Sequence, residues 1–232
     1  MVFNNEVPVI TLDGPSGTGK GTICHLLAKR LHWNMLDSGA IYRVLAYAAR
    51  KNSIETNEIK KLTDLARSLN LRFESSADNE TKVILDDENV SQQIRSEQCG
   101  QDASQIAVIP EVRAALLERQ RNFAQFPGLV TDGRDMGTVV FPNAVLKVYL
   151  YASAEERANR RYLQLQDNGI NVSLAQVVEE LAKRDARDTA RTHAPLKPAE
   201  DAVLIDTTGL TIVQVFNIVL KLIDERLNNL YF

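Results

Sequence analysis

Short apolar runs alternate along the chain with longer stretches in which apolar residues recur at helical spacing. The short runs are typical of buried strands, and they occupy residues 7–12, 33–36, 129–132, 146–151 and 203–205. The longer stretches are typical of helices with one apolar face, and they cover residues 23–31, 41–48, 57–69 and 110–126, with three more after the capping residues Ser153, Ser173 and Thr211. We therefore predict an α/β fold in which helices flank a parallel sheet.

One part of the chain has a different pattern. Apolar and polar residues alternate over 71–74 and 81–85, and polar turns follow at 75–80 and 86–89. Alternation of this kind is typical of strands with one exposed face, so the stretch predicts a small antiparallel sheet inserted into the parallel fold at residues 70–95. A surface hairpin without a function is the alternative.

The strongest chemical motif follows the first apolar run. Glycines let backbone N–H groups surround an anion, the helix N-terminus adds free donors, and Lys20 supplies a cation that can reach the terminal phosphates. The order of strand, glycine loop and helix therefore predicts a P-loop for a nucleoside triphosphate rather than a surface turn. The predicted loop residues are Gly14, Pro15, Ser16, Gly17, Thr18, Gly19, Lys20, Gly21 and Thr22.

The motif departs from the usual pattern at one position. A serine or threonine normally follows the lysine and touches Mg²⁺, whereas this chain has Gly21 there and Thr22 behind it. We expect Mg²⁺ to arrive with ATP and to be held through water, and we assign no metal ligand among the protein's residues.

Composition narrows the class of protein. The 232 residues carry a net charge of −3, with 44% hydrophobic and 25% charged residues, so charge gives no reason to expect nucleic acid or membrane as partner. No apolar run approaches the roughly 20 residues of a membrane span, and residues 1–6 do not resemble a signal peptide. The two cysteines, Cys24 and Cys99, have no spacing motif and are expected to be reduced thiols, which predicts a cytoplasmic enzyme.

A P-loop alone indicates only that a nucleoside triphosphate binds, so the second substrate must be recognised elsewhere. Polar residues gather in four further places, at residues 36–43, at 102–104 with Arg113, at 132–138 and at 184–191. Ligands of open α/β sheets bind at the ends of strands and in the short loops that follow them.

Together these stretches resemble the cytidylate kinase family of P-loop nucleoside monophosphate kinases. The resemblance rests on Gly-Pro-Ser-Gly at 14–17, Asp-Ser-Gly-Ala-Ile-Tyr-Arg at 37–43 and Asp-Gly-Arg-Asp-Met-Gly-Thr-Val-Val-Phe-Pro at 132–142, and it covers nearly the whole chain. It implies a core at residues 1–69, 96–152 and 173–232, a nucleotide-binding insert at 70–95, and a lid at 153–172.

The resemblance also implies an activity and a set of roles. The reaction would be transfer of the γ-phosphoryl group of ATP to CMP or dCMP, by a protein that acts as a monomer. Ser38, Arg113, Asp135 and Arg191 would surround the base, Ser104, Arg184 and Asp188 would hold the sugar, and Arg43 and Arg134 would bind the acceptor phosphate. Lys20 and Arg134, with the lid arginines Arg157, Arg160 and Arg161, would act as the catalytic cations.

The chemistry of cytosine is compatible with these roles. Cytosine offers an amine donor, from which Asp135 can accept, and acceptors to which arginine can donate. Uracil has a carbonyl in place of the amine, so the carboxylate would lose its bond.

Several other interpretations remain open at this point. Asp132 can be a partner of Mg²⁺ or a turn former, and Ser38 can cap the helix that follows it. Arg184, Arg187 and Arg191 can belong to a solvated face paired with Asp185 and Asp188. The alternative functions are a kinase of another small acceptor, and a P-loop switch that binds a partner protein; Gly21 argues against the switch.

Overall fold

A computed structural model of the protein describes residues 6–75, 81–167 and 169–231. The chain divides into two units, one formed by Met1–Asp37 with Gln120–Phe232, which we name the P-loop unit, and the other, the second unit, by Ser38–Arg119. The polar turn predicted at residues 75–80 lies, apart from Ser75, outside the described residues.

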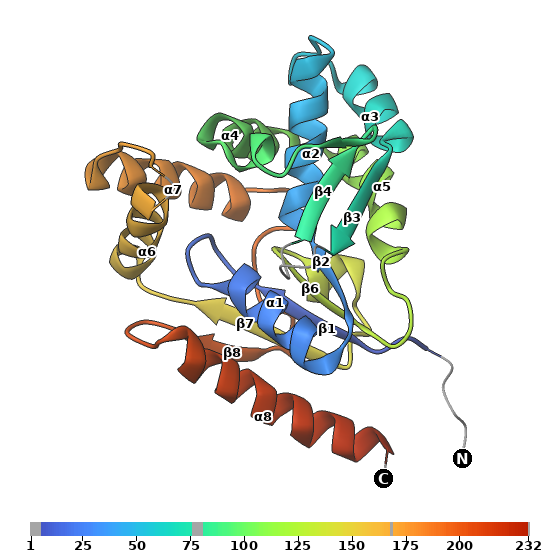
Figure 1. Ribbon diagram of the computed structural model, residues 1–232, viewed down its shortest axis with the longest axis vertical. Coiled ribbons are helices and arrows are strands. Elements are labelled where there is room, and N and C mark those ends of the chain that lie inside the picture. Colours follow the sequence, from blue (N-terminus) through green and yellow to red (C-terminus); the bar gives the residue numbers. More distant parts are fainter. Residues whose placement is uncertain (1–5, 76–80, 168, 232) are drawn as a thin grey trace. The chain divides into compact units, whose positions relative to one another are not determined.

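A parallel sheet with the strand order β2-β6-β1-β7-β8 forms the centre of the P-loop unit (Figure 1). Its strands are β1 (Val9–Asp13), β2 (Asn34–Asp37), β6 (Leu129–Gly133), β7 (Leu146–Tyr151) and β8 (Val203–Asp206). Thr11 of β1 lies opposite Thr131 of β6 and Lys147 of β7. The carboxyl ends of the three central strands therefore meet at one edge of the sheet, where open α/β folds bind their ligands.

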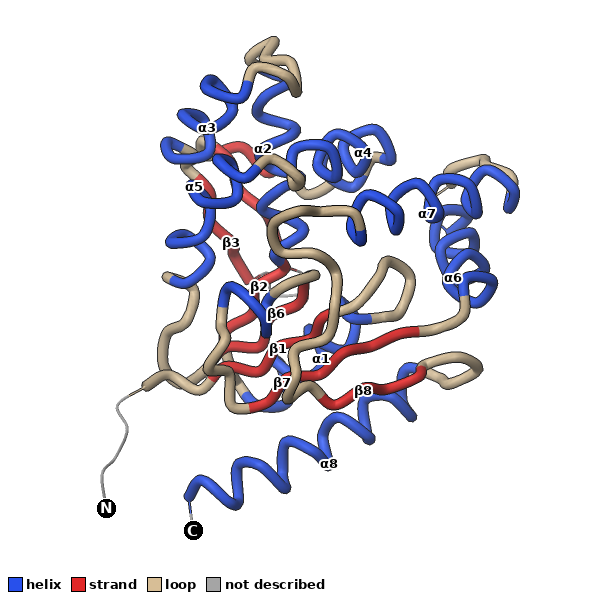
Figure 2. The backbone as a smooth tube through the Cα atoms, turned by 180° about the vertical axis from the view of Figure 1, so that it is seen from behind, coloured by secondary structure: helices blue, strands red, loops and turns tan. Residues whose placement is uncertain are grey.

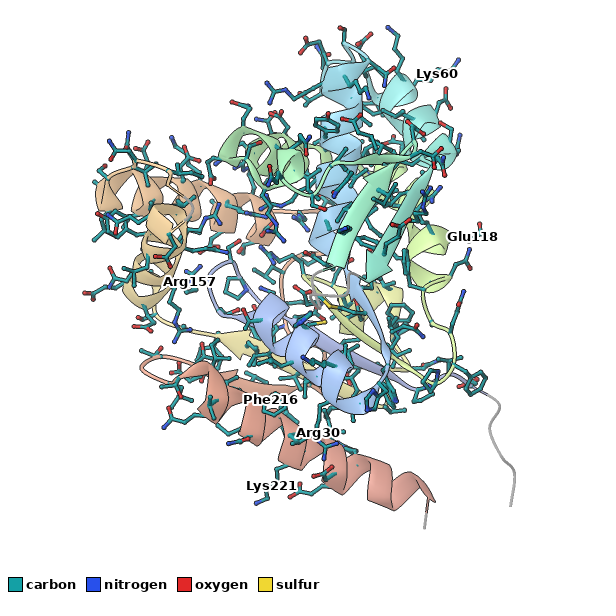
Figure 3. All side chains as sticks on the ribbon, in the orientation of Figure 1. Arg30, Lys60, Glu118, Arg157, Phe216 and Lys221 are labelled. Atoms are coloured by element: carbon teal, nitrogen blue, oxygen red, sulfur yellow. The ribbon has the colours of Figure 1, made fainter. Side chains whose placement is uncertain are left out.

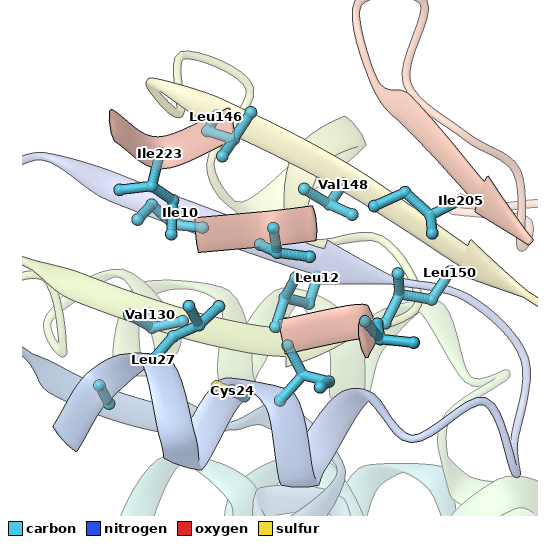
Figure 4. Packing of buried hydrophobic residues seen from close by; sticks show 14 residues of the cluster. Ile10, Leu12, Cys24, Leu27, Val130, Leu146, Val148, Leu150, Ile205 and Ile223 are labelled. Atoms are coloured by element: carbon cyan, nitrogen blue, oxygen red, sulfur yellow. The ribbon is translucent and has the colours of Figure 1, made fainter. Parts of the chain in front are cut away.

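Two helices of the P-loop unit form a core with one face of this sheet (Figure 4). Ile10 and Leu12 of β1 are fully buried there, together with Leu27 of α1 and Ile223 of α8. Because side chains alternate across a strand, Asp13 is directed to the opposite face of the sheet. The helical elements of the unit are α1 (Lys20–Leu31), the π-helical turn η2 (Met136–Val140), α6 (Ala154–Asp167), α7 (Leu174–Thr189) and α8 (Ile212–Tyr231).

Helices α6 and α7 pack on each other through a small apolar cluster of their own, seen as a separate pair in Figure 2. Ala158 and Leu165 of α6 contribute to the cluster, and Val177 and Leu181 of α7 complete it. The cluster fixes the two helices to each other.

The second unit combines an antiparallel sheet of order β3-β4-β5 with helices. Its elements are α2 (Ser38–Lys51), α3 (Ile59–Ser68), β3 (Leu71–Ser75), β4 (Thr81–Leu85), β5 (Glu88–Asn89), the 3₁₀ turn η1 (Gln93–Arg95), α4 (Glu97–Ile106) and α5 (Pro110–Arg121), of which the last two residues belong to the P-loop unit. The Ser96 hydroxyl accepts a hydrogen bond from the Cys99 N–H and caps α4.

The structure confirms the predicted α/β class with its parallel sheet and an antiparallel sheet within residues 70–95. The predicted helix at 110–126 is too long, because the chain leaves α5 after Arg121 in two tight turns, with Phe123 and Ala124 donating to carbonyls three residues earlier. Helix α4 was not predicted because its buried face consists largely of small residues such as Gly100 and Ala103, which leave little apolar periodicity.

Two of the three predicted capping boxes form completely, and the third forms in part. At Ser173 and Gln176, and again at Thr211 and Gln214, both reciprocal hydrogen bonds are present. Ser153 accepts from the Glu156 N–H, but its own N–H donates to the Thr208 hydroxyl instead of the Glu156 side chain. Ser153 thus joins the start of α6 to the loop after β8.

Candidate active site

The phosphate loop between β1 and α1 requires glycine for two physical reasons. Gly14 and Gly17 have φ angles of +143° and +81°, which other residues rarely adopt. A Cβ at Gly14 would lie 2.0 Å from the Leu150 carbonyl oxygen, and one at Gly17 would lie 2.8 Å from the Arg157 carbonyl oxygen. Gly21, by contrast, is exposed, and a Cβ there would meet no described atom within 4 Å, so packing does not impose the missing hydroxyl.

Lys20 begins α1 and is almost buried, with 6% of its surface exposed. Its ammonium donates to the Pro15 carbonyl at 2.7 Å and lies 3.5 Å from the Thr18 hydroxyl. Burial lowers the pKa of Lys20, and the Arg134 charge adds to this effect, whereas Asp132 and Asp13 oppose it. The anionic phosphates of a bound nucleotide would favour the protonated ammonium.

Asp132 lies at the end of β6 and is also buried. Burial raises the pKa of Asp132, and the neighbouring Asp37 carboxylate adds to it, while Lys20 and Arg134 act in the other direction. Its Oδ1 atom has no hydrogen-bond partner among the described residues. Across the described ranges, no three His, Cys, Asp or Glu side chains are grouped so that they could hold a metal ion.

Residues 134–137 follow β6 and form what we name the acceptor loop, after the role that the family resemblance implies for Arg134 and Asp135. The Arg134 guanidinium donates through Nη2 to the Ser16 hydroxyl and through Nε to Asp188 Oδ2, both at 2.7 Å. Asp135 is 3% exposed. The structure thus brings the P-loop, the acceptor loop and the end of α7 together, although 118 residues separate Ser16 from Arg134.

The end of α7 contains a buried carboxylate between two guanidinium groups. Asp188 is 1% exposed, and its second oxygen, Oδ1, accepts a hydrogen bond from Arg191. Burial alone would raise the pKa of Asp188, but the Arg134 and Arg191 charges outweigh it and hold the pKa below its ordinary value. The alternative of a solvated charged face on α7 is therefore wrong for Asp188. Arg184 lies close enough to Lys20 for its charge to lower the pKa of the ammonium.

The three arginines predicted to belong to a lid, of which Figure 3 labels Arg157, have different surroundings. Arg157 is buried, and it donates to the Ser16 carbonyl through Nη1 at 3.2 Å and pairs with Asp185 through Nη2 at 2.7 Å. Arg160 donates to the hydroxyl and the carbonyl of Thr207. Arg161 contacts Gln164 on an exposed part of α6. The first turns of α6 are thus held against the P-loop and the loop after β8.

The second unit contains the other four residues expected to bind the acceptor. Arg43 donates to the Ile94 carbonyl at 3.0 Å, and Arg113 donates to the Ala107 carbonyl with its guanidinium 5.9 Å from the Tyr42 ring centroid. The Ser104 hydroxyl is buried and has no hydrogen-bond partner among the described residues. Ser38 is the first residue of α2 and is buried.

Sequence reasoning missed Asp13 and Thr207 at this site, and it named Asp185 only as a partner on a solvated face rather than as the partner of Arg157. Both carboxylate oxygens of Asp13 accept N–H bonds from the acceptor loop. Thr207 is fully buried and its hydroxyl also donates to the Tyr151 carbonyl. In the sequence, Asp13 ends a strand directly before Gly14 and Asp185 lies within the polar stretch 184–191, whereas no motif marked Thr207.

Comparisons with known proteins show which family the chain belongs to. A family model described as cytidylate kinase matches residues 10–225. The cytidylate kinase of Shewanella loihica is 53% identical over 98% of this chain and 99% of its own length, and that of Pseudomonas syringae pv. tomato is 56% identical over 95% and 97%. The crystal structure of an uncharacterized protein from Eubacterium ventriosum shares the fold, with a TM-score of 0.53 at 12% identity over 95% of this chain and all of that one.

The helices were also compared with the requirements of a membrane span. In the part of the chain that the structure describes, none is both long enough and apolar enough to cross a bilayer.

From the match over 10–225 and the identities above 50%, the chain belongs to the cytidylate kinase family.

Proposed function

We propose that the protein transfers the γ-phosphoryl group of ATP to CMP or dCMP, producing ADP with CDP or dCDP. The observation that carries the proposal is the bond from Arg134 to the P-loop residue Ser16, which joins a cation of the acceptor loop to the donor loop. Phosphoryl transfer depends on alignment and on neutralisation of charge. No general base is needed, because the acceptor phosphate is already an anion.

The roles within the P-loop unit follow from the surroundings of each cation. Residues 14–22 bind ATP, and Lys20 and Arg134 stabilise the transferring group. Arg157 and Arg160 hold the lid at 153–172 against the P-loop, which is supported by their bonds to Ser16 and Thr207. With Arg161, which contacts Gln164, they complete the set of catalytic cations that the family resemblance implies.

The proposal retains the acceptor roles that the family resemblance implies. Ser38, Arg113, Asp135 and Arg191 recognise the base, and Arg43 and Arg134 bind the acceptor phosphate. Ser104, Arg184 and Asp188 hold the sugar, with residues 70–95 as the nucleotide-binding insert. The buried Ser104 hydroxyl supports its role, because a sugar hydroxyl would supply the hydrogen bond that it lacks among the described residues.

Magnesium fits the donor groups near the P-loop. Mg²⁺ keeps several waters and is usually bound by one or two carboxylates together with substrate phosphates. The Oδ1 atom of Asp132, which has no hydrogen-bond partner in the described part of the chain, and the exposed Thr22 are the groups that would meet this hydrated ion. When bound with ATP, the ion would neutralise charge on the phosphates.

The cellular setting belongs to the proposal as well. Cys24 and Cys99 are unpaired and buried, which is typical of a reducing compartment, so we place the enzyme in the cytoplasm. We take the monomer as the active form, with ATP and the nucleoside monophosphate as its partners. The proposal includes neither a nucleic acid nor a membrane among the partners.

The activity can be tested by coupled detection of ADP release with each nucleoside monophosphate in turn. CMP and dCMP should support rapid release, UMP much slower release, and AMP and GMP none above background. The control omits the acceptor and measures ATP hydrolysis alone. Equal rates with and without acceptor would indicate an NTPase, and a preference for a purine nucleotide would favour a kinase of another acceptor.

Substitution of Asp135 by alanine tests how the base is recognised. The change removes the bond from the cytosine amine and, with it, the repulsion of the uracil carbonyl. CMP should lose about 1.5–3 kcal/mol of transition-state binding while UMP loses much less. The ratio of kcat/KM for CMP to that for UMP should fall by about 10- to 100-fold. Parallel losses with both nucleotides would contradict base recognition by Asp135.

A further inference from the structure

We propose that Asp13 is a positioning residue that sets the direction of Arg134 and Asp135, and through them the preference for cytosine. The inference rests on the proposed roles of these two residues. Asp13 is the last residue of β1 and directly precedes Gly14 of the P-loop. It is 5% exposed. Its position at the start of the donor loop makes it suited to align that loop with the acceptor loop.

Two hydrogen bonds join Asp13 to the acceptor loop. Oδ1 accepts from the Met136 N–H at 2.9 Å, and Oδ2 accepts from the Gly137 N–H at 2.7 Å. These N–H groups belong to the first residues of η2, where helical turns have no internal acceptors. Asp13 therefore caps η2 from a strand 123 residues away in the sequence.

The acceptor loop is held on both sides of Asp135. On its amino-terminal side, Arg134 donates to the Ser16 hydroxyl of the P-loop. On its carboxyl-terminal side, the Met136 and Gly137 amides are held by Asp13. Because Arg134 is bonded to Ser16 within the P-loop and the Met136 and Gly137 amides to Asp13 directly before it, the backbone that carries Asp135 has little freedom to rotate.

Close packing under Gly137 strengthens this arrangement. A Cβ at Gly137 would lie 2.9 Å from the Thr11 hydroxyl and 3.2 Å from the stem of Lys147, so the turn rests directly on β1 and β7. Thr11 contributes no hydrogen bond there, because its hydroxyl has no partner among the described residues. Asp13 therefore bonds the N–H groups of the first two residues of η2, while Arg121 donates to the carbonyls of Val139 and Val140 at the other end of the turn.

A carboxylate is the side chain this arrangement requires. Two backbone donors need two acceptor oxygens on one side chain, whereas an amide would direct its NH₂ group at one of the N–H donors. Burial disfavours the charge and raises the pKa of Asp13 to about 6. The charged groups around it are Lys20 of α1, Asp132 of β6 and Asp135 of the acceptor loop, and Tyr149 of β7 faces it as well.

The test compares Asp13→Asn with Thr11→Val, which changes the same face of β1 without removing a described hydrogen bond. In the Asp13 variant, the ratio of kcat/KM for CMP to that for UMP should fall about tenfold, less than the roughly 100-fold that a displacement of 1 Å can produce. KM for CMP should rise, while KM for ATP should change less than about twofold. Thr11→Val should keep the ratio of the unchanged protein.

The outcomes separate this inference from the proposed function. A general loss of stability would lower both activities in proportion and leave the ratio unchanged. If Asp135→Ala lowers the ratio but Asp13→Asn and Asp13→Ser keep it, the inference is overturned and the function stands. If Asp135→Ala also keeps it, the proposed recognition of cytosine has failed. If neither Asp13 variant folds, Asp13 serves the fold itself and the inference is likewise overturned.

Discussion

Replacement of Lys20 by alanine is expected to lower kcat by a factor on the order of 10² to 10⁴. The Lys20 ammonium donates to the Pro15 carbonyl within the P-loop and lies near the Arg134 charge. The position of the ammonium is therefore set before the nucleotide binds. Loss of one preorganised electrostatic group usually reduces kcat by about 10² to 10³, and the developing charge on the phosphoryl group makes this position sensitive. Steady-state kinetics at saturating ATP and CMP measures the effect.

The matched control for this prediction is Lys29→Ala, which removes an exposed lysine from the same helix. It should leave kcat unchanged. The Lys20 variant should still unfold cooperatively, because this residue begins α1 and is not part of its apolar face. A Lys20→Ala protein with nearly normal kcat would show that residues 14–22 do not bind the triphosphate in the reaction.

Asp188→Ala is expected to produce the largest loss of stability, about 3–5 kcal/mol in the free energy of unfolding. Its carboxylate is almost fully buried and pairs with both Arg134 and Arg191, so its removal takes one buried ion pair from each guanidinium group. Breaking a buried ion pair from one side costs about this amount. Urea unfolding of both proteins at neutral pH measures the difference.

The control for Asp188 is Glu179→Ala, which breaks the exposed pair with Lys183 on the same helix. This change should leave the unfolding midpoint unaltered, because exposed pairs contribute little.

Asp188→Asn offers a second comparison through pH. The pKa of Asp188 lies below its ordinary 3.8 in the folded protein, so the stability advantage of the wild type is present above that pH.

As the pH falls below 3.8 and through the lowered pKa, Asp188 takes up a proton and the advantage over Asp188→Asn should disappear. An Asp188→Ala protein as stable as the wild type would show that solvent, rather than Asp188, compensates the two arginines. The same variant should lose kcat/KM for CMP more than affinity for ATP, because Arg134 and Arg191 are assigned to the acceptor.

The sequence by itself determined the fold class and predicted where the donor nucleotide binds. Strand periodicity and helical periodicity depend on neighbours within a few residues, so β1, β7 and the amphipathic helices were predictable from local pattern. The P-loop was equally predictable, because all its chemistry lies in one contiguous stretch at residues 14–22. The motif from Asp132 to Pro142 could be recognised in the same way, because its residues are consecutive in the chain.

Only the tertiary structure decided which polar groups meet. Arg157 contacts Ser16 across 141 residues, and Arg134 contacts Asp188 across 54, so no local pattern contains either pair. In the sequence, Asp13 is an ordinary residue at the end of a strand. Only the packing of η2 on the same face of the sheet shows that Asp13 caps this turn. Such contacts depend on strand order and helix packing, which bring distant side chains together. For that reason the sequence indicated which residues carry the chemistry, while the fold alone determined what holds them in position.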